Sequence, residues 1–293
     1  MGRLTSKVDQ KGTQTSYKYD AAGNKSEIIY ASNSGSFSQK IQTDWLAEYN
    51  LPTQRRYYDA AGSVVKSVEW DYGNDGQINS HSIRDGKDSR ISRFEYCTAT
   101  DVSSGSCPFI GLLKSADGTR TDVQDRQTYS YYSSDDAACN SPSTCLHRKG
   151  DLREVVDNLG RTTQYLTYDG AGRPLSIKDA NGIVTDYTYH PRGWLTATKV
   201  RGADASSEAD DRITRIDYWP TGLVKQVTQP DGAFTAFTYD AAHRLTDITD
   251  NAGNAVHYTL DNAGDRIKED TTDASGTLKR TLSRVYNQLG QLK

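Results

Sequence analysis

The chain has 293 residues, of which 35% are hydrophobic, and its 19 tyrosines make tyrosine the main residue available to build a core. The 35 Lys and Arg residues nearly balance the 38 Asp and Glu residues, without long runs of either sign, so no basic face argues for nucleic acid or an anionic membrane as a partner. No apolar stretch is long enough to span a bilayer, and the first residues lack the apolar segment of a signal peptide.

The N-terminal half carries two copies of the phrase YDAAG, at residues 19–23 and 58–62. Strand-favouring Thr, Tyr, Val and Ile flank these copies, whereas Asp and Gly within them favour a chain reversal. We therefore predict β-strands joined by tight turns, with strands at 25–30, 90–97, 112–117 and 128–132. A polar insertion rich in Ser and Asn, at 31–39, separates the two copies, and we expect it to form a loop.

Residues 70–76, WDYGNDG, superficially resemble a calcium-binding loop. An EF-hand requires acidic ligands at alternate positions and a glutamate at the end of the loop, and neither occurs in this register. A strand that ends in an Asn-Asp-Gly turn is the better interpretation. We predict no metal site and no cofactor in this chain.

The four cysteines are Cys97, Cys107, Cys139 and Cys145, and all lie in segments that look like loops. Their spacings are unlike the short ligand pairs of zinc sites, so we favour disulfides over free thiols, and free thiols over a metal. Of the three pairings, we choose the local one, Cys97 with Cys107 and Cys139 with Cys145. Disulfides would place the chain in an oxidising compartment.

From Gly150 onward the pattern becomes regular. Glycines recur ten residues apart, and the phrase Tyr-x-x-x-Gly at 168–172 returns after 21 residues at 189–193. Each unit therefore holds two turns and their strands, and because one hairpin cannot bury its apolar face, the units should stack. We predict a single array over 1–293, with insertions that make 1–149 less regular than 150–293. The repeat residues are Tyr19, Gly23, Tyr58, Gly62, Tyr168, Gly172, Gly182, Tyr189, Gly193, Tyr218, Gly222, Gly232, Tyr239, Gly253 and Gly264.

The alternation along each strand predicts one aromatic face and one polar face, with Tyr187 and Tyr189 on one side and Thr188 on the other. Because the tyrosines recur at a fixed phase, packing is a better explanation for them than stacking on bases or sugars. A row of exposed aromatic rings could still bind glycans, and Trp194 and Trp219 are candidates for such a cluster.

The sequence contains none of the common catalytic or nucleotide-binding motifs. The five histidines are dispersed, and His190 and His243 fall in turns, where they replace the usual Asp or Gly. The acidic insertion at 202–211 reads as a solvated loop rather than as a pair of catalytic carboxylates. We therefore predict no catalytic residues.

The phrases YDAAGNKSEI, YYDAAGSVVKSV, TYDGAGRPLSIKDANGIVTDYTYHPRGWL and TYDAAHRLTDITDNAGNAVHYTLDNAGDRI resemble the YD repeats of the Rhs (rearrangement hotspot) family. The segment CNSPSTCLHRKGDL at 139–152 is similar to bacterial members. The resemblance covers most of the chain and is strongest from about residue 146 to the end. It implies an all-β strip of antiparallel hairpins that forms a curved, spiralling sheet, as part of a hollow shell. In bacterial polymorphic toxins and insecticidal toxin complexes the shell encloses a C-terminal toxin, and in teneurins it carries adhesion modules.

The chain lacks the Asp-Pro-x-Gly-Leu core segment through which many members cleave themselves, and no variable toxin domain follows the repeats. Neither autoproteolysis nor toxicity is therefore carried over to this chain from the resemblance. Both ends fall within a repeat and carry no obvious cap, so we expect an excised fragment or ends that pair with another chain.

The function expected from the sequence is a non-enzymatic scaffold from a bacterial secreted or surface toxin-type protein. Its partners would be the rest of a longer Rhs-type chain or a toxin cargo, with self-association through the uncapped ends. The alternative is a module that binds glycans or a partner protein through an aromatic face or an open edge strand.

Overall fold

The computed structural model describes residues 2–9, 14–31, 37–140, 145–204, 207–286 and 292–293. The chain divides into two compact units. The first comprises Met1–Cys139 and His147–Thr163, and the second comprises Asn140–Leu146 and Gln164–Lys293.

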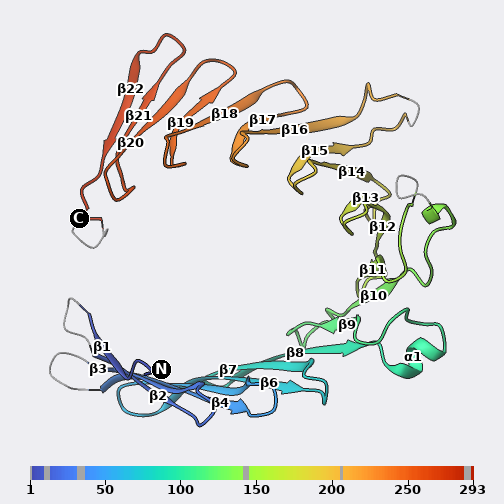
Figure 1. Ribbon diagram of the computed structural model, residues 1–293, viewed down its shortest axis with the longest axis vertical. Coiled ribbons are helices and arrows are strands. Elements are labelled where there is room, and N and C mark those ends of the chain that lie inside the picture. The colour runs from blue at the N-terminus through green and yellow to red at the C-terminus, as the bar shows by residue number, and fades with distance from the viewer. Residues whose placement is uncertain (1, 10–13, 32–36, 141–144, 205–206, 287–291) are drawn as a thin grey trace. The chain divides into compact units, whose positions relative to one another are not determined.

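The first unit is a meander in which each strand pairs antiparallel with the next (Figure 1). A helix, α1 (Ala99–Ser103), lies between β8 and β9, and a 3-10 helix, η1 (Ala137–Asn140), follows β10. The strands are β1 (Ser6–Val8), β2 (Gln14–Tyr19), β3 (Lys25–Ala31), β4 (Phe37–Leu46), β5 (Leu51–Tyr58), β6 (Val64–Tyr72), β7 (Ile78–Asp85), β8 (Asp88–Tyr96), β9 (Leu113–Asp117), β10 (Gln127–Tyr131) and β11 (Leu152–Val156).

The second unit repeats this arrangement with shorter and more uniform strands, again each antiparallel to the next. The strands are β12 (Thr162–Tyr168), β13 (Pro174–Lys178), β14 (Val184–Tyr189), β15 (Leu195–Val200), β16 (Arg212–Tyr218), β17 (Val224–Thr228), β18 (Phe234–Tyr239), β19 (Leu245–Asp250), β20 (Ala255–Leu260), β21 (Arg266–Thr272) and β22 (Leu278–Ser283).

A shift in register occurs at the same place in many strands, directly before the final tyrosine. It lies between Thr188 and Tyr189, and again between Asp217 and Tyr218 and between Thr238 and Tyr239. A bulge of this kind bends the strand and turns the next side chain away from its expected direction. Each of these bulges therefore lies beside the tyrosine that ends its strand.

The core is shallow, as the low hydrophobic content leads one to expect. Tyr168 and Tyr258 are among the few apolar side chains that are less than a tenth exposed, and none of the described side chains is fully buried. On β14, Thr188 is exposed while Tyr187 and Tyr189 are half-buried, which agrees with the alternation in the sequence. Most apolar side chains are therefore buried on one side only.

The predicted all-β class is confirmed, and the strands expected at 25–30, 90–97, 112–117 and 128–132 correspond to β3, β8, β9 and β10. Two local expectations were wrong. Part of the insertion at 31–39 is strand rather than loop, because Ala31 ends β3 and Phe37 begins β4, and these residues pair. The segment after Cys97 contains a short helix that the strand pattern did not indicate. Among the described residues, no helix has the length and hydropathy required to cross a membrane.

Candidate functional site

The repeat tyrosines tie neighbouring strands together through their hydroxyl groups. Three of the repeat tyrosines in the second unit each donate to the carbonyl of the first residue of the preceding strand. The bonds, of 2.8–3.1 Å, run from Tyr189 to Pro174, from Tyr218 to Leu195 and from Tyr239 to Val224. Burial raises the pKa of Tyr189, which keeps its hydroxyl a neutral donor. A satisfied hydrogen bond of this kind contributes about 1 kcal/mol to stability.

The first unit uses the same device where its sequence is less regular. The hydroxyl of Tyr19 donates to the carbonyl of Leu4 at 2.8 Å, and that of Tyr72 donates to the carbonyl of Pro52 at 2.9 Å. Tyr58 differs, because its hydroxyl donates to the side-chain oxygen of Gln42 at 2.5 Å. Tyr168, at the end of β12, is only 7% exposed.

The aspartate that follows the tyrosine closes the turn. One oxygen of Asp169 accepts from the backbone N–H of Ala171 at 2.9 Å and of Arg173 at 3.0 Å. Its other oxygen accepts from Nε and Nη2 of the Arg173 guanidinium, at 2.6 and 2.5 Å. Burial alone would raise the pKa of Asp169, but the hydrogen bonds from Arg173 outweigh it and hold that pKa below its ordinary value. Asp157 with Arg161 and Asp240 with Arg244 repeat this pair.

The glycine of each turn adopts the left-handed conformation, which side chains disfavour. Gly23, Gly62, Gly172, Gly182, Gly193, Gly222, Gly232, Gly253 and Gly264 all have φ between 76° and 99°. His243 stands in a glycine position of the repeat and has φ 63°. Gly222 carries a second constraint, because a Cβ there would lie 2.7 Å from the ring of Trp194.

The predicted disulfides are present. Cys97 bonds Cys107, and both are buried, with 2% and 6% of their surface exposed. Cys139 and Cys145 are disulfide-bonded as well, and no cysteine of the described residues is free. No group of three or more His, Cys, Asp or Glu side chains within the described ranges is arranged to hold a metal ion.

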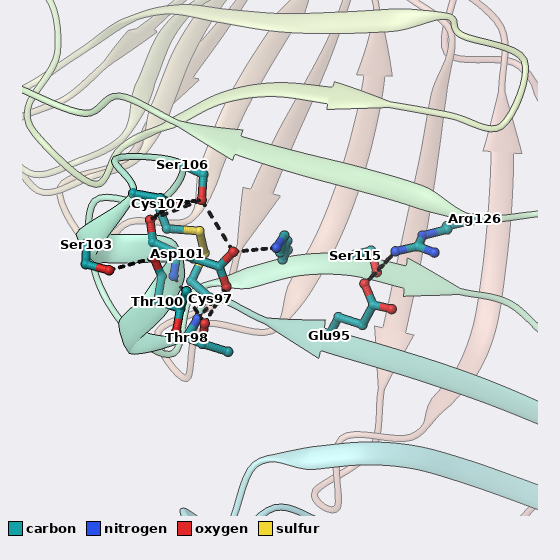
Figure 2. Close-up of polar contacts among 12 residues, drawn as sticks. Glu95, Cys97, Thr98, Thr100, Asp101, Ser103, Ser106, Cys107, Ser115 and Arg126 are labelled. Carbon is teal, nitrogen blue, oxygen red and sulfur yellow. Dashed lines mark hydrogen bonds and ion pairs between the residues drawn. A yellow bond between two sulfur atoms is a disulfide. The ribbon is translucent and has the colours of Figure 1, made fainter.

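Figure 2 shows the loop that the Cys97–Cys107 disulfide closes around α1. Thr98 caps the helix, since its hydroxyl accepts from the backbone N–H of Asp101 at 3.2 Å while the Asp101 carboxylate accepts from the backbone N–H of Thr98 at 2.8 Å. Lys114 donates to that carboxylate at 2.6 Å, and this bond, together with those from Thr98, lowers the pKa of Asp101 far below its ordinary value. The spacing Thr-x-x-Asp is the signal in the sequence that could have predicted the helix.

A polar rung in each unit joins an acid, a buried serine and an arginine. In the first unit Ser115, 2% exposed, donates to Glu95 at 2.9 Å, and Arg126 contacts the same carboxylate at 2.5 Å (Figure 2). In the second unit Ser176 donates to Asp186, which also pairs with Arg201 at 2.7 Å. The hydrogen bonds from Arg201 and Ser176 outweigh burial and lower the pKa of Asp186. The acid, serine and arginine of each rung bond one another. The rungs therefore connect neighbouring strands and do not present unpaired reactive groups.

A depression of about 610 Å³ lies beside the disulfide loop and is lined in part by Glu95, Asp101 and Lys114. Each of these charges already has a partner, as does the fourth charged group of the lining, Asp75, which accepts from the backbone N–H of Gln77 at 3.1 Å. In residues 70–76 the structure has a turn closed by the bond from the N–H of Gly73 to the carbonyl of Gln77.

The histidines remain dispersed. His190 and His243 lie in turns of the second unit, where the Nδ1 of His190 accepts from the backbone N–H of Arg192 at 3.1 Å. His257 contacts the carboxylate of Asp247 at 2.6 Å. Burial alone would raise the pKa of Asp247, but the hydrogen bonds from His257, Thr246 and Thr238 outweigh it and lower that pKa. His81 lies beside Trp70 in the first unit, with ring centroids 5.7 Å apart.

In the acidic insertion at 202–211, carboxylates accept hydrogen bonds from backbone N–H groups of the same segment. The carboxylate of Asp211 accepts from the backbone N–H of Gly202 at 2.7 Å, and that of Asp210 from Ala203 at 2.7 Å. Lys199 bonds Glu208 at 2.8 Å, and that contact, with Asp186 and Asp211 nearby, raises the pKa of Lys199. Residues 205–206 lie outside the described ranges.

The second unit also brings together the two tryptophans named from the sequence. The ring of Trp194 stacks on His190 at 4.9 Å between centroids and lies 5.3 Å from the ring of Tyr218. Trp219 follows Tyr218 and donates its ring N–H to the carbonyl of Phe237 at 3.2 Å. A depression of about 620 Å³ is lined in part by His190, Trp194, Tyr218 and Trp219.

Strand-ending tyrosines, aspartate turns and left-handed glycines, recurring along an antiparallel meander, define the chain as a YD-type β-hairpin repeat protein. The RHS Repeat family model matches residues 2–34, 147–182, 168–205, 218–255 and 240–278, slightly more than half of the chain. The chain belongs to this family. No curated protein matches it.

Among solved structures, the chain is similar to the crystal structure of TcdB2-TccC3 without its hypervariable C-terminal region, with a TM-score of 0.65 and 15% identity over 98% of this chain. It is also similar to TcdB2-TccC3-Cdc42, with a TM-score of 0.51 and 12% identity over 97% of this chain. At these identities the likeness shows a shared fold. The chain spans 15% and 19% of the length of those two chains.

Proposed function

We propose that the chain is a non-enzymatic segment of an Rhs-type shell, from a bacterial secreted or surface protein that encloses or displays a cargo. The observation that supports this most is a repeated set of bonds between strands. Tyrosine hydroxyl, aspartate turn and glycine recur along both units and, within the described ranges, do not converge on a reactive centre. Hydrogen bonds of this kind between strands stabilise a wide, thin sheet, and a shell is built from such a sheet.

The similarity to TcdB2-TccC3 supports the same proposal at the level of fold, because this chain matches about a seventh of that much longer chain. A segment of a larger wall would continue strand by strand into the rest of that wall. The partners proposed for this chain are therefore further repeats of an Rhs-type chain and the cargo inside.

Strand β22 offers a place to test whether the sheet can continue. It pairs with β21 and with no other strand in the part of the chain that the structure describes. The backbone N–H of Arg284 donates to the carbonyl of Ile267 at 2.9 Å, so the N–H of Ser283, one residue earlier, points away from β21. Ser283 is exposed. An outward N–H on an exposed strand is what a further strand would bind.

The experiment is light scattering with small-angle X-ray scattering of the pure chain over a concentration series. The proposal predicts association that grows with concentration and that weakens by about tenfold in Ser283→Pro, which lacks the outward N–H. Ser283→Val keeps that N–H and should associate like the wild type. A wild-type monomer at every concentration would contradict a sheet built to continue.

The alternative, a surface-binding module, gains one specific observation, the cluster of Trp194 and Trp219. Scaffold and binding surface are compatible on one chain.

A further inference from the structure

A hollow of about 330 Å³ lies on the first unit and is lined mainly by side chains of β3, β4 and β5. Its volume falls near the lower end of the range of about 300–1,000 Å³ that is usual for ligand pockets. A hollow of this size suits a single ring with a short side chain better than a polymer.

Three consecutive strands direct side chains into this hollow from one face of the sheet. Ile28 of β3 pairs with Ile41 of β4, which pairs in turn with Tyr57 of β5. Paired residues of antiparallel strands share a face, and so do residues two apart along a strand, so Thr43 and Arg55, which also pair, lie on that face. The hollow therefore combines an aliphatic surface, an aromatic ring and polar groups.

The charge of this hollow is one-sided. Its lining contains two cations, Lys25 and Arg55, and no Asp or Glu, although acidic residues outnumber basic ones in the whole chain. Neither cation forms an ion pair with any residue that the structure describes. The ammonium of Lys25 lies 5.0 Å from the centre of the Tyr17 ring, and the guanidinium of Arg55 lies 5.8 Å from that of the Trp70 ring. A ring attracts a cation without neutralising its charge.

One hydrogen bond orients the guanidinium of Arg55. Its Nε donates to the hydroxyl of Thr43 at 3.2 Å, and Thr43 is only 7% exposed. The two terminal nitrogens of Arg55 donate to no group within the described ranges. Because Thr43 accepts the bond from Arg55, its own hydroxyl hydrogen is available to a ligand. A half-buried, oriented fork of N–H groups matches the geometry of a carboxylate.

Two aromatic residues of the lining differ in how they are held. The ring N–H of Trp45 donates to the carbonyl of Lys25 at 3.1 Å, which joins β4 to the first residue of β3. The hydroxyl of Tyr57, unlike those of the repeat tyrosines, has no hydrogen-bond partner in the part of the chain that the structure describes. The hollow thus has a supported lining and unused donors.

The hollow beside the Cys97–Cys107 disulfide has the opposite character. Its charged residues are three acids and one lysine, Asp75, Glu95, Asp101 and Lys114, and each is bonded within the structure. It offers an anion neither a surplus of positive charge nor an unpaired cation.

We propose that the hollow of β3, β4 and β5 binds a small aromatic carboxylate. The carboxylate accepts from the terminal N–H groups of Arg55 and from the hydroxyl of Thr43, while the ring covers Ile28 and Ile41. Of the two cations only Arg55 is half-buried, whereas Lys25 is exposed and its attraction is screened by solvent. One oriented cation matches the single charge of a carboxylate better than the double charge of a phosphate ester.

An aromatic body is favoured over an aliphatic one by the rings of Trp45 and Tyr57, because aromatic pairs attract one another beyond the area that they bury. This inference goes beyond the proposed scaffold, since a wall requires no ligand at this place.

The test is isothermal titration of the intact chain with phenylpropionate, and with phenylpropionamide, phenyl phosphate and hexanoate as comparisons. We expect saturable binding of phenylpropionate with a Kd of about 0.1–1 mM, as for a ligand of this size. The amide has the same ring without the charge and should bind at least about tenfold more weakly. Phenyl phosphate and hexanoate should each bind about threefold more weakly or worse.

The variants separate the fork from the charge. Arg55→Gln should weaken binding of phenylpropionate about tenfold, Arg55→Lys should recover only part of that loss, and Lys25→Gln should cost about twofold to threefold. The matched control is Lys40→Gln, because Lys40 also lies over a tyrosine ring, that of Tyr58 at 4.0 Å, but on the face of β4 opposite to Thr43. Its affinity should stay within about twofold of the wild type.

Circular dichroism of each variant separates loss of binding from loss of fold, and Lys25→Gln changes an exposed side chain only. The inference is overturned if phenylpropionate does not saturate the chain up to about 10 mM, or if any of the three comparison compounds binds as tightly. It is also overturned if Lys40→Gln weakens binding as much as Arg55→Gln. None of these results depends on whether β22 pairs with another strand, so the site and the proposed scaffold can fail separately.

Discussion

The turns at 169–172 and 219–222 share the same pattern of backbone hydrogen bonds but differ in the side chain at their first position. In each, the first N–H donates across the turn at 2.9 Å and the glycine N–H donates back, at 3.0 Å in one and 2.9 Å in the other. The first carries a carboxylate held by an arginine, whereas the second carries an exposed tryptophan. The turn geometry is therefore set by the strands and the glycine.

The difference shows what the aspartate adds. Because the turn forms without it, the Asp–Arg pair contributes stability rather than shape, and the position after the tyrosine is free to change where another interaction is useful. A repeat protein can place a binding residue there without disturbing its neighbours.

The largest effect is expected at the glycine of the tryptophan turn. Gly222→Ala places a Cβ in a left-handed residue with φ 90° and only 2.7 Å from the Trp194 ring. Backbone strain of about 1–2 kcal/mol and overpacking of about 1–3 kcal/mol should together lower the free energy of unfolding by about 2–5 kcal/mol. Urea unfolding measures this change.

Gly232→Ala is the matched control, because its φ is 85° and nothing lies within 4 Å of the added Cβ. It should cost only the strain, about 1–2 kcal/mol. Equal losses at both glycines would show that Trp194 does not pack on the turn as described.

A smaller effect is expected from the aspartate of the regular turn. Asp169→Ala removes two bonds from backbone N–H groups and the pair with Arg173, so we expect a loss of about 1–2 kcal/mol in urea unfolding. Asp179 accepts the same two kinds of backbone bond, from Asn181 and Ile183, without an arginine. Asp179→Ala should therefore cost less, and a larger cost there would contradict a stabilising role for the Asp–Arg pair.

The fold could be predicted because its information is local and repeated. Turn residues and strand residues alternate with a fixed period, and each tyrosine bonds a strand that is its neighbour in the chain, so the order of strands follows the order of the sequence. Even the Asp–Arg pair has a visible signal, since Arg173 follows Asp169 by four residues. Prediction was poorer where the repeat is interrupted. The repeat pattern indicates neither the pairing of Ala31 with Phe37 across the Ser-rich insertion nor the helix after Cys97.

The candidate site was only partly predictable. Trp194 and Trp219 stand out in the sequence as aromatic residues near turns, but their relation depends on how consecutive turns lie against each other. The packing of Trp194 against Gly222 is a three-dimensional fact. The polar rung of Ser176, Asp186 and Arg201 was missed for the same reason.

The pH dependence of stability should distinguish an ionised turn from a neutral one. The pKa of Asp169 in the folded chain lies below its ordinary value of 3.8, since the hydrogen bonds from Arg173 outweigh burial. The stabilisation from its ionised form is thus fully present above about pH 4 and is lost as the pH falls below that value. Asp169→Asn should be less stable than the wild type at about pH 7, and the gap should close toward about pH 2 in urea titrations. A gap that stays constant would show that the charge plays no part.

The smallest effect, and the most direct test of the comparison, comes from restoring the repeat at the tryptophan turn. Trp219→Asp would supply a carboxylate to the N–H groups of Thr221 and Leu223, as Asp169 does for its own turn, while removing the indole. Relative to Trp219→Ala, which removes the ring and adds nothing, it should be more stable by about 1 kcal/mol, the usual value of such a cap. If Trp219→Asp is no more stable than Trp219→Ala, the turn at 219–222 cannot accept the aspartate of the repeat, and its tryptophan is required by the local structure rather than exchanged for a binding role.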